Sequence, residues 1–233
     1  MFHRYILGVY DLYERLNTAF PQILFESCAS GGGRFDPGIL YYAPQGWTSD
    51  DTDAAERVKI QYGTSMCYPV SSMGSHVSVV PNHQLNRKTP LHTRANVAYF
   101  GTFGYELDVT KIPEEDRKMI PEQTKMYHKY HELVREGDYY RIASYRENHL
   151  YDCWAVAAKD KSEVLVTYVH VLSTPNAHSR RIFLQGFDPE AVYALEGTDE
   201  KYTGEMLMKC GFLVKGFWGD FRSKLYHFVK VNE

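Results

Sequence analysis

Apolar residues follow a helical period in the first part of the chain and alternate with polar residues in the second. The first segment has apolar side chains at Ile6, Val9, Leu12 and Leu16, a helical spacing that stops before Pro21. The elements expected up to residue 136 are a helix at 3–20, a short buried strand at 22–27, a helix at 52–66, strand-like runs at 71–80 and 96–109, and a long helix at 113–136. In the last of these, proline stands at the first helical position, and Pro121 is expected to kink or split the helix.

The pattern changes at Gly137-Asp138. From Tyr139 onward the segments YRIASY, CWAVAAK, EVLVTYVHVL, RRIFLQG, AVYAL and LYHFVKV show period-two or short apolar runs separated by turn residues. Such runs are typical of an antiparallel β-sandwich. We therefore expect two domains, residues 1–137 and 138–233.

The fold class expected is α/β followed by all-β. Helices alternate with strands in the first domain, which predicts a parallel sheet with its functional loops after the strands. About four β/α units are too few to close a barrel of eight, and the chain opens directly on a helix. We expect a fragment whose first part is missing.

Composition excludes several classes of protein. The chain has 233 residues, 26 Lys+Arg against 29 Asp+Glu, and a net charge of −3, so neither nucleic acid nor a membrane surface is an expected partner. Its charged start does not resemble a secretory signal. The four cysteines are widely spaced, which argues against a zinc ribbon or a disulfide framework and favours a cytoplasmic protein. Aromatic residues reach 15%, which suits stacking on sugar rings but is also common in β-sheets.

The stretch CASGGGRFD follows the first expected strand. It lacks the spacing of a phosphate loop or a dinucleotide fingerprint. Its glycines permit a close approach of the backbone to a small polar ligand, although a flexible turn is an equally good interpretation. Cys28 at its start has no partner that would make it a nucleophile, and we expect it to line a pocket.

The stretch WTSDDTD at residues 47–53 places three aspartates beside a tryptophan. One interpretation is structural: Ser49 or Asp50 caps the following helix, and Asp51 and Asp53 favour its positive end. The spacing fits neither a calcium loop nor a DDxxD metal site, so no metal is expected. The other interpretation is a general acid, because a neighbouring carboxylate and an apolar wall raise the pKa of a carboxyl group.

Two histidines, His76 in GSHVS and His83 in PNHQ, could be metal ligands or bases. A single histidine near a strand end is more often a structural hydrogen-bonding residue. We leave both out of the catalytic set.

Long stretches of the chain resemble the α-galactosidases of glycoside hydrolase family 36. The resemblance is carried by CASGGGRFD, WTSDDTDAAER, PNHQ, RANVAYFGTFGYELD and GDYYRI, and it extends over essentially the whole chain. It implies a retaining glycosidase without a cofactor, built on a (β/α)8 TIM barrel, of which this chain would hold about the last four units, with a C-terminal β-sandwich. Asp50 would be the catalytic acid/base. The substrate-binding residues would be Cys28, Ala29, Ser30, Gly31 and Trp47.

The resemblance also implies a nucleophilic aspartate in a Lys-Trp-Asp motif, and this chain contains no Trp-Asp pair. A retaining mechanism needs two carboxyl groups about 5 Å apart, so we expect the chain alone to be inactive. The implied substrates are terminal α-D-galactosides such as melibiose and raffinose, and the implied full-length assembly is a homo-oligomer, a tetramer in relatives. The alternatives are an α-N-acetylgalactosaminidase, a transglycosylating relative, or a non-catalytic sugar-binding or assembly fragment.

Overall fold

The computed structural model describes residues 1–28, 36–176 and 179–231. Helices and parallel strands alternate up to residue 136, and antiparallel strands dominate after it. The elements of the first region are α1 Phe2–Ala19, β1 Glu26–Ser27, α2 Ile39–Tyr42, β2 Gln45–Gly46, α3 Ala54–Ser65, a 3₁₀ turn Val70–Ser72, β3 Gly74–Ser78, α4 Leu91–Ala98, β4 Thr102–Glu106 and α5 Glu114–Glu136.

The four strands of this region run parallel. β1 pairs with β2, and β3 pairs with β4 over five residues. A parallel bridge between Gly46 and Met73 joins the two pairs, so β1 to β4 follow one another in chain order. Because the strands are parallel, the segments after all four leave from the same edge of the array.

Antiparallel pairing builds the second region. Its elements are β5 Asp138–Ala143, α6 Tyr145–Asn148, β6 Tyr151–Ala157, β7 Glu163–His170, β8 Ser179–Ile182, β9 Val192–Leu195, β10 Lys201–Thr203, a π-helical turn Met206–Cys210, β11 Phe212–Lys215 and β12 Arg222–Lys230. Six strands form one sheet in the order β10-β9-β12-β7-β6-β5, and β8 pairs with β11 separately.

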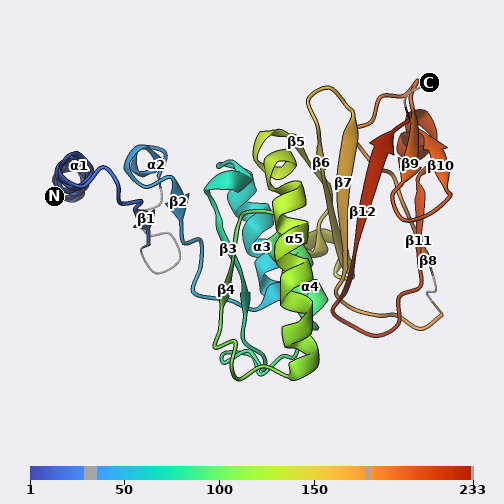
Figure 1. Cartoon of the computed structure of the whole chain (residues 1–233), viewed down its shortest axis with the longest axis horizontal. Helices are drawn as coiled ribbons and strands as arrows, with labels where there is room; N and C mark the ends of the chain where they lie inside the picture. The colour runs from blue at the N-terminus through green and yellow to red at the C-terminus, as the bar shows by residue number, and fades with distance from the viewer. Residues whose placement is uncertain (29–35, 177–178, 232–233) are drawn as a thin grey trace.

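The helices lie between the parallel strands and the antiparallel sheet. Figure 1 shows α3, α4 and α5 between the β3–β4 pair on one side and the sheet of β5, β6, β7 and β12 on the other. The alternation along β6 explains this layering: Trp154 and Val156 pack with residues of the helices, whereas Cys153, Ala155 and Ala157 pack in a second cluster with residues of β8 and β11. The period-two pattern of the sequence therefore buries both faces of the strand.

Several sequence-based expectations about local structure are wrong. Residues 22–27 are not a buried strand: only Glu26–Ser27 are extended, and Ile23 and Leu24 are exposed. Residues 96–98 belong to α4, so the strand expected at 96–109 is confined to Thr102–Glu106. Pro113 is the N-cap of α5 rather than its first residue, and Pro121 lies within one continuous helix that it does not split.

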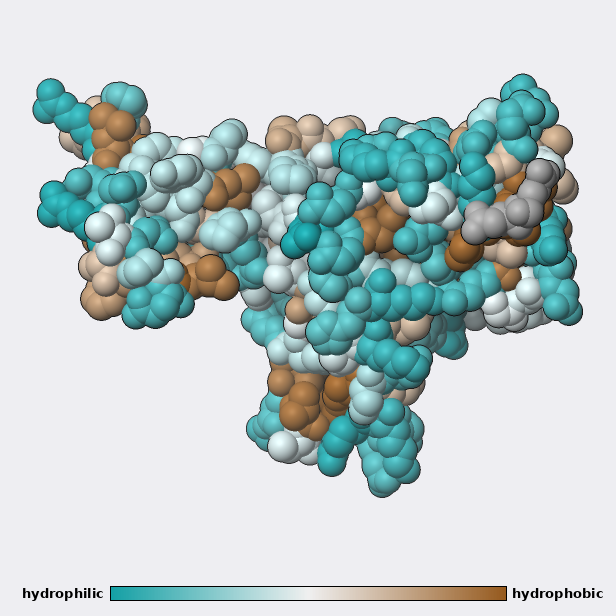
Figure 2. Space-filling view, turned by 45° about the horizontal axis from the view of Figure 1, so that its top comes forward, coloured by the Kyte–Doolittle hydropathy of each residue, from teal (hydrophilic) through white to brown (hydrophobic). Residues whose placement is uncertain are grey.

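The N-terminal segment stands apart from the main body (Figure 1). None of the α1 residues is buried, and Figure 2 shows hydrophobic surface over this segment, at the left of the view. The exposed apolar residues of the segment are Phe2, Tyr5, Leu7, Leu12, Phe20, Ile23 and Leu24. Within the described residues, no helix has both the length and the apolar character needed to cross a bilayer.

One buried carboxyl group makes stability depend on pH. Asp152, at the second position of β6, is 1% exposed and accepts a hydrogen bond of 3.0 Å from the backbone N–H of Tyr145. Burial raises the pKa of Asp152 to about 7. The folded state therefore binds this proton more tightly than the unfolded state, so stability is greatest below the unfolded pKa near 3.8 and falls as pH rises towards 7.

We predict that Asp152→Asn, which mimics the protonated carboxyl group, removes this pH dependence. Between pH 5 and pH 8 the free energy of unfolding of the wild type should fall relative to the variant by a few kcal/mol, since each pKa unit corresponds to about 1.4 kcal/mol. Urea denaturation at both pH values measures the difference. Asp199→Asn, at an exposed position, is the matched control. Equal pH dependence in the wild type and Asp152→Asn would contradict the prediction.

Candidate functional site at the carboxyl ends of the parallel strands

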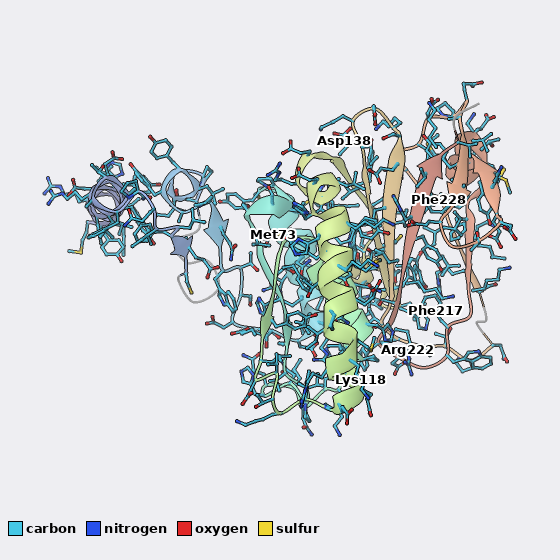
Figure 3. The ribbon with its side chains drawn as sticks, in the orientation of Figure 1. Met73, Lys118, Asp138, Phe217, Arg222 and Phe228 are labelled. Carbon is cyan, nitrogen blue, oxygen red and sulfur yellow. The ribbon has the colours of Figure 1, made fainter. Side chains whose placement is uncertain are left out.

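The candidate site lies where the parallel strands end. Met73, next to the start of β3, is near the upper end of the array, whereas Lys118 in the second turn of α5 is at the lower end (Figure 3). The chain passes from β4 to α5 at that lower end, so the segments after β2, β3 and β4 leave the strands there. The stretch WTSDDTD is one of these loops, because it directly follows β2.

Asp50 is exposed, and it is oriented by Trp47. The indole Nε1 of Trp47 donates a hydrogen bond of 3.2 Å to Oδ1 of Asp50. The ring of Trp47 in turn stacks on the imidazole of His76 in β3, with centroids 4.3 Å apart and an interplanar angle of 2°. The tryptophan therefore connects the end of β2 to the middle of β3 and orients the exposed Asp50 carboxylate at the edge where the parallel strands end.

The structure gives a different role to the third aspartate of the stretch. The N-cap of α3 is Asp53, not Ser49 or Asp50 as the structural interpretation of the sequence had it. Its carboxylate accepts hydrogen bonds from the backbone N–H groups of Ala55 at 3.0 Å and Glu56 at 3.1 Å, and it pairs with Arg87. Asp53 is 2% exposed, so this carboxylate is structural and Asp50 is free of the cap.

A buried arginine anchors the loop after β2, which carries Asp50. Arg57 of α3 is 2% exposed, and its guanidinium donates to the carbonyl of Gly74 and, at 3.5 Å, to the carbonyl of Ser49. Burial lowers the pKa of Arg57 to about 10, with the charges of Asp51 and Glu106 acting in the opposite direction. The group therefore stays cationic at neutral pH and holds α3, the loop after β2 and the start of β3 together.

A cavity of about 210 Å³ opens beside Trp47. Among its lining residues are Gln45, Trp47, His76 and Glu106, which come from three neighbouring strands and the loop after β2. The side chain of Gln45 also donates to the carboxylate of Glu26 in β1. The lining therefore combines aromatic rings with a few polar side chains, among them the carboxylate of Glu106, and a sugar ring presents matching apolar and hydroxylated surfaces.

Burial raises the pKa of Glu106, and the negative charges of Asp50 and Glu26 add to that effect. The positive charges of Arg57 and His83 oppose it. The pKa of Glu106, the last residue of β4, therefore depends on the charge of Asp50 in the loop after β2.

Sequence reasoning found some members of this site and missed others. Cys28, at the end of β1, is exposed, whereas Ala29, Ser30 and Gly31 lie outside the described residues. His76 had been set aside, and Glu106 and Arg57 had not been noticed. The available sequence signal is the period of two: it places His76 and Ser78 on one face of β3, and in the structure their register partners Gly104 and Glu106 lie on the same face of β4. The described residues contain no group of three or more His, Cys, Asp or Glu arranged to hold a metal ion.

Two family models match this chain. The melibiase model matches residues 1–137, and the model of the glycosyl hydrolase family 36 C-terminal domain matches residues 151–228. The chain is 46% identical over 231 residues to α-galactosidase AgaA of Geobacillus stearothermophilus and, also over 231 residues, 46% identical to α-galactosidase Mel36A of Lactobacillus acidophilus. Each alignment covers 99% of this chain and 31% of the relative, so the chain spans about a third of the length of these relatives.

A solved structure shares the arrangement as well. A variant of AgaA from Geobacillus stearothermophilus in complex with raffinose superimposes with a TM-score of 0.94 at 46% sequence identity. The superposition covers 98% of this chain and 32% of that one. The fold described above is therefore that of one contiguous part of a longer glycosidase.

The contrast between Asp53 and Asp50 gives a stability prediction. Asp53→Ala should lower the free energy of unfolding by at least about 1–2 kcal/mol, because it removes the helix cap and leaves Arg87 without the Asp53 carboxylate. Asp50→Asn should change it by less than about 0.5 kcal/mol, as expected for an exposed residue. Urea denaturation of the chain compares the two variants, with Asp53→Asn as the control that retains a capping oxygen. A larger loss for Asp50→Asn than for Asp53→Ala would contradict the structural assignment.

Proposed function

This chain belongs to glycoside hydrolase family 36, and we propose that it forms part of the active centre of an α-galactosidase that hydrolyses terminal α-D-galactosides. The observation that carries the proposal is the position of Asp50, exposed at the carboxyl end of a parallel strand and hydrogen-bonded by Trp47. Enzymes built of parallel β/α units carry their catalytic residues at this edge of the strands. The raffinose complex of the AgaA variant supports an oligosaccharide of this class as the substrate.

In this proposal Asp50 is the general acid/base. It protonates the oxygen of the departing group and then removes a proton from the water that attacks the galactosyl intermediate. The hydrogen bond from the indole N–H fixes the direction of the carboxylate. The galactose ring would be bound by Trp47, Cys28, Ala29, Ser30 and Gly31.

The second carboxylate comes from outside this chain. The sequence contains no Trp-Asp pair, so it lacks the motif that the resemblance implies for the nucleophile. We interpret residues 1–137 as about four β/α units of a (β/α)8 barrel and residues 138–233 as a β-sandwich. In support, β1 to β4 are parallel, the strands after residue 137 are antiparallel, and α5 ends at Glu136 just before β5.

The matched relatives favour α-galactosidase over α-N-acetylgalactosaminidase, because both are named α-galactosidases. A homo-oligomeric assembly and a cytoplasmic location remain predictions.

The test is to supply the missing part. We predict that the chain alone does not hydrolyse 4-nitrophenyl α-galactoside or raffinose, because it carries only one of the two carboxylates. Joined to the other two-thirds of AgaA from Geobacillus stearothermophilus, in place of the homologous third, it should hydrolyse both. Release of galactose and 4-nitrophenol measures the activity. Turnover by the chain alone would contradict the proposed division of the active centre.

In the joined protein, Asp50→Asn should reduce kcat/KM for raffinose by at least about 100-fold, the usual contribution of general acid catalysis. The loss should be smaller for 4-nitrophenyl α-galactoside, whose leaving group needs less protonation. Asp108→Asn is the matched control, since Asp108 is also exposed and follows β4 at the same edge. If Asp50→Asn hydrolysed raffinose like the control, Asp50 would not be the acid/base.

A further inference from the structure

The ring of Trp47 is held from two sides. On its edge, Nε1 donates to Asp50 at 3.2 Å. On its face, the imidazole of His76 lies parallel to it, 2° from coplanar and with centroids 4.3 Å apart. Rotation of the indole would break both contacts, so the orientation of the Asp50 carboxylate depends on the position of His76.

His76 is a neutral platform at neutral pH. Its side chain is 6% exposed, and burial together with the charge of Arg57 lowers the pKa of His76 to about 4. Glu106 Oε2 lies 2.9 Å from Nε2 of His76, but the Nε2 atom has no aligned hydrogen-bond partner among the described residues. The contact is therefore a close approach of a carboxylate to a neutral ring, not an ion pair.

The surroundings of His76 are not those of a ring packed in an apolar core. Its ring lines the cavity of about 210 Å³, together with the half-buried Trp47 and with Glu106, whose side chain is 50% exposed. A histidine stack away from this cavity serves for comparison: His170 at the end of β7 packs against Tyr168 and against Phe217 of the β11–β12 loop, with the Phe217 ring centroid 5.4 Å away.

We infer that His76 and Glu106 are positioning residues for the reaction proposed above: the Glu106 carboxylate lies against the edge of the imidazole, the imidazole packs on the indole, and the indole orients the Asp50 carboxylate. The inference rests on the proposed function. It assigns no proton transfer to His76 or Glu106; both act through Trp47. A support of this kind keeps a catalytic group within a fraction of an ångström of its working position.

The test distinguishes a change in the orientation of the Asp50 carboxylate from a general loss of folding. Protonation of the leaving group matters for raffinose and matters much less for 4-nitrophenyl α-galactoside. A misplaced acid should therefore lower the substrate ratio, defined as kcat/KM for raffinose divided by kcat/KM for the aryl substrate. In the full chain joined to the rest of AgaA, His76→Ala should lower kcat/KM for raffinose about 10-fold more than for the aryl substrate, because misplacing an acid forfeits part of its effect of roughly 100-fold or more. His76→Phe retains a flat ring against Trp47 and should retain most of the wild-type ratio.

Glu106→Gln tests the outer member of the network. It should lower the same ratio about 3-fold, and His76→Ala combined with Glu106→Gln should be no worse than His76→Ala alone, because residues acting through one another are not additive. His170→Ala and His170→Phe are the matched controls. They change a buried, stacked histidine away from the cavity and should leave the substrate ratio at the wild-type value, even where thermal stability drops.

The outcomes are distinct. If the joined wild-type protein hydrolyses neither substrate, the proposed function fails and the inference falls with it. If the wild type is active and His76→Ala lowers both substrates equally, or no more than His170→Ala, the positioning role is wrong while the proposed function stands. Additive losses in the double variant would remove Glu106 from the network.

Discussion

The buried guanidinium of Arg57 is the interaction on which the site depends. A single cation on α3 bonds to the loop that carries Asp50 and to the first residue of β3. Removing it would leave buried carbonyl groups without donors, and such groups are costly in a protein interior. The charges of Asp51 and Glu106 favour its cationic form, so the acidic residues of the site and the arginine below them stabilise one another.

The antiparallel sheet supports this arrangement through the helices. α5 contacts the sheet at its C-terminal half, where Lys129 donates to Glu196 at 2.6 Å and the ring of Tyr130 meets His227 with centroids 5.0 Å apart. His227 of β12 lies between Glu163, the first residue of β7, and Glu196, which directly follows β9. The α4 helix is attached separately, since Asn96 and Thr93 both bond to Ser223 of β12. The helices that back the site strands are thus fixed to the antiparallel sheet.

The face opposite the helices carries several polar side chains and an indole ring. Glu26, Gln45, Trp47, His76 and Glu106 occupy it from four successive strands and the loops at their ends. Beside this face the N-terminal helix exposes apolar side chains, among them Phe2, Tyr5 and Leu12. This agrees with the proposal that further polypeptide completes the active centre, and with the coverage of about a third of the related α-galactosidases.

The sequence alone determined the kind of elements and the identity of the family. The helical spacing at 3–20 and 52–66, the period-two runs after Tyr139 and the stretch WTSDDTD could all be interpreted without coordinates, because they rest on contacts between near neighbours in the chain. The buried strand expected at 22–27 is wrong because no described residue covers the apolar side chains of Ile23 and Leu24, which stay exposed. The expected helix cap is wrong because several adjacent residues can cap, and the bond from Arg87, 34 residues away from Asp53, favours one of them.

The composition of the site was decided by tertiary structure. The stack of Trp47 on His76, the approach of Glu106 to His76 and the bond of Arg57 to Gly74 join residues that are 29, 30 and 17 positions apart. No local pattern encodes such contacts, because they depend on the parallel register of β3 and β4 and on the direction in which α3 crosses them. The sequence identifies Asp50 as the candidate acid/base, and only the packing of strands and helices decides which side chains contact it.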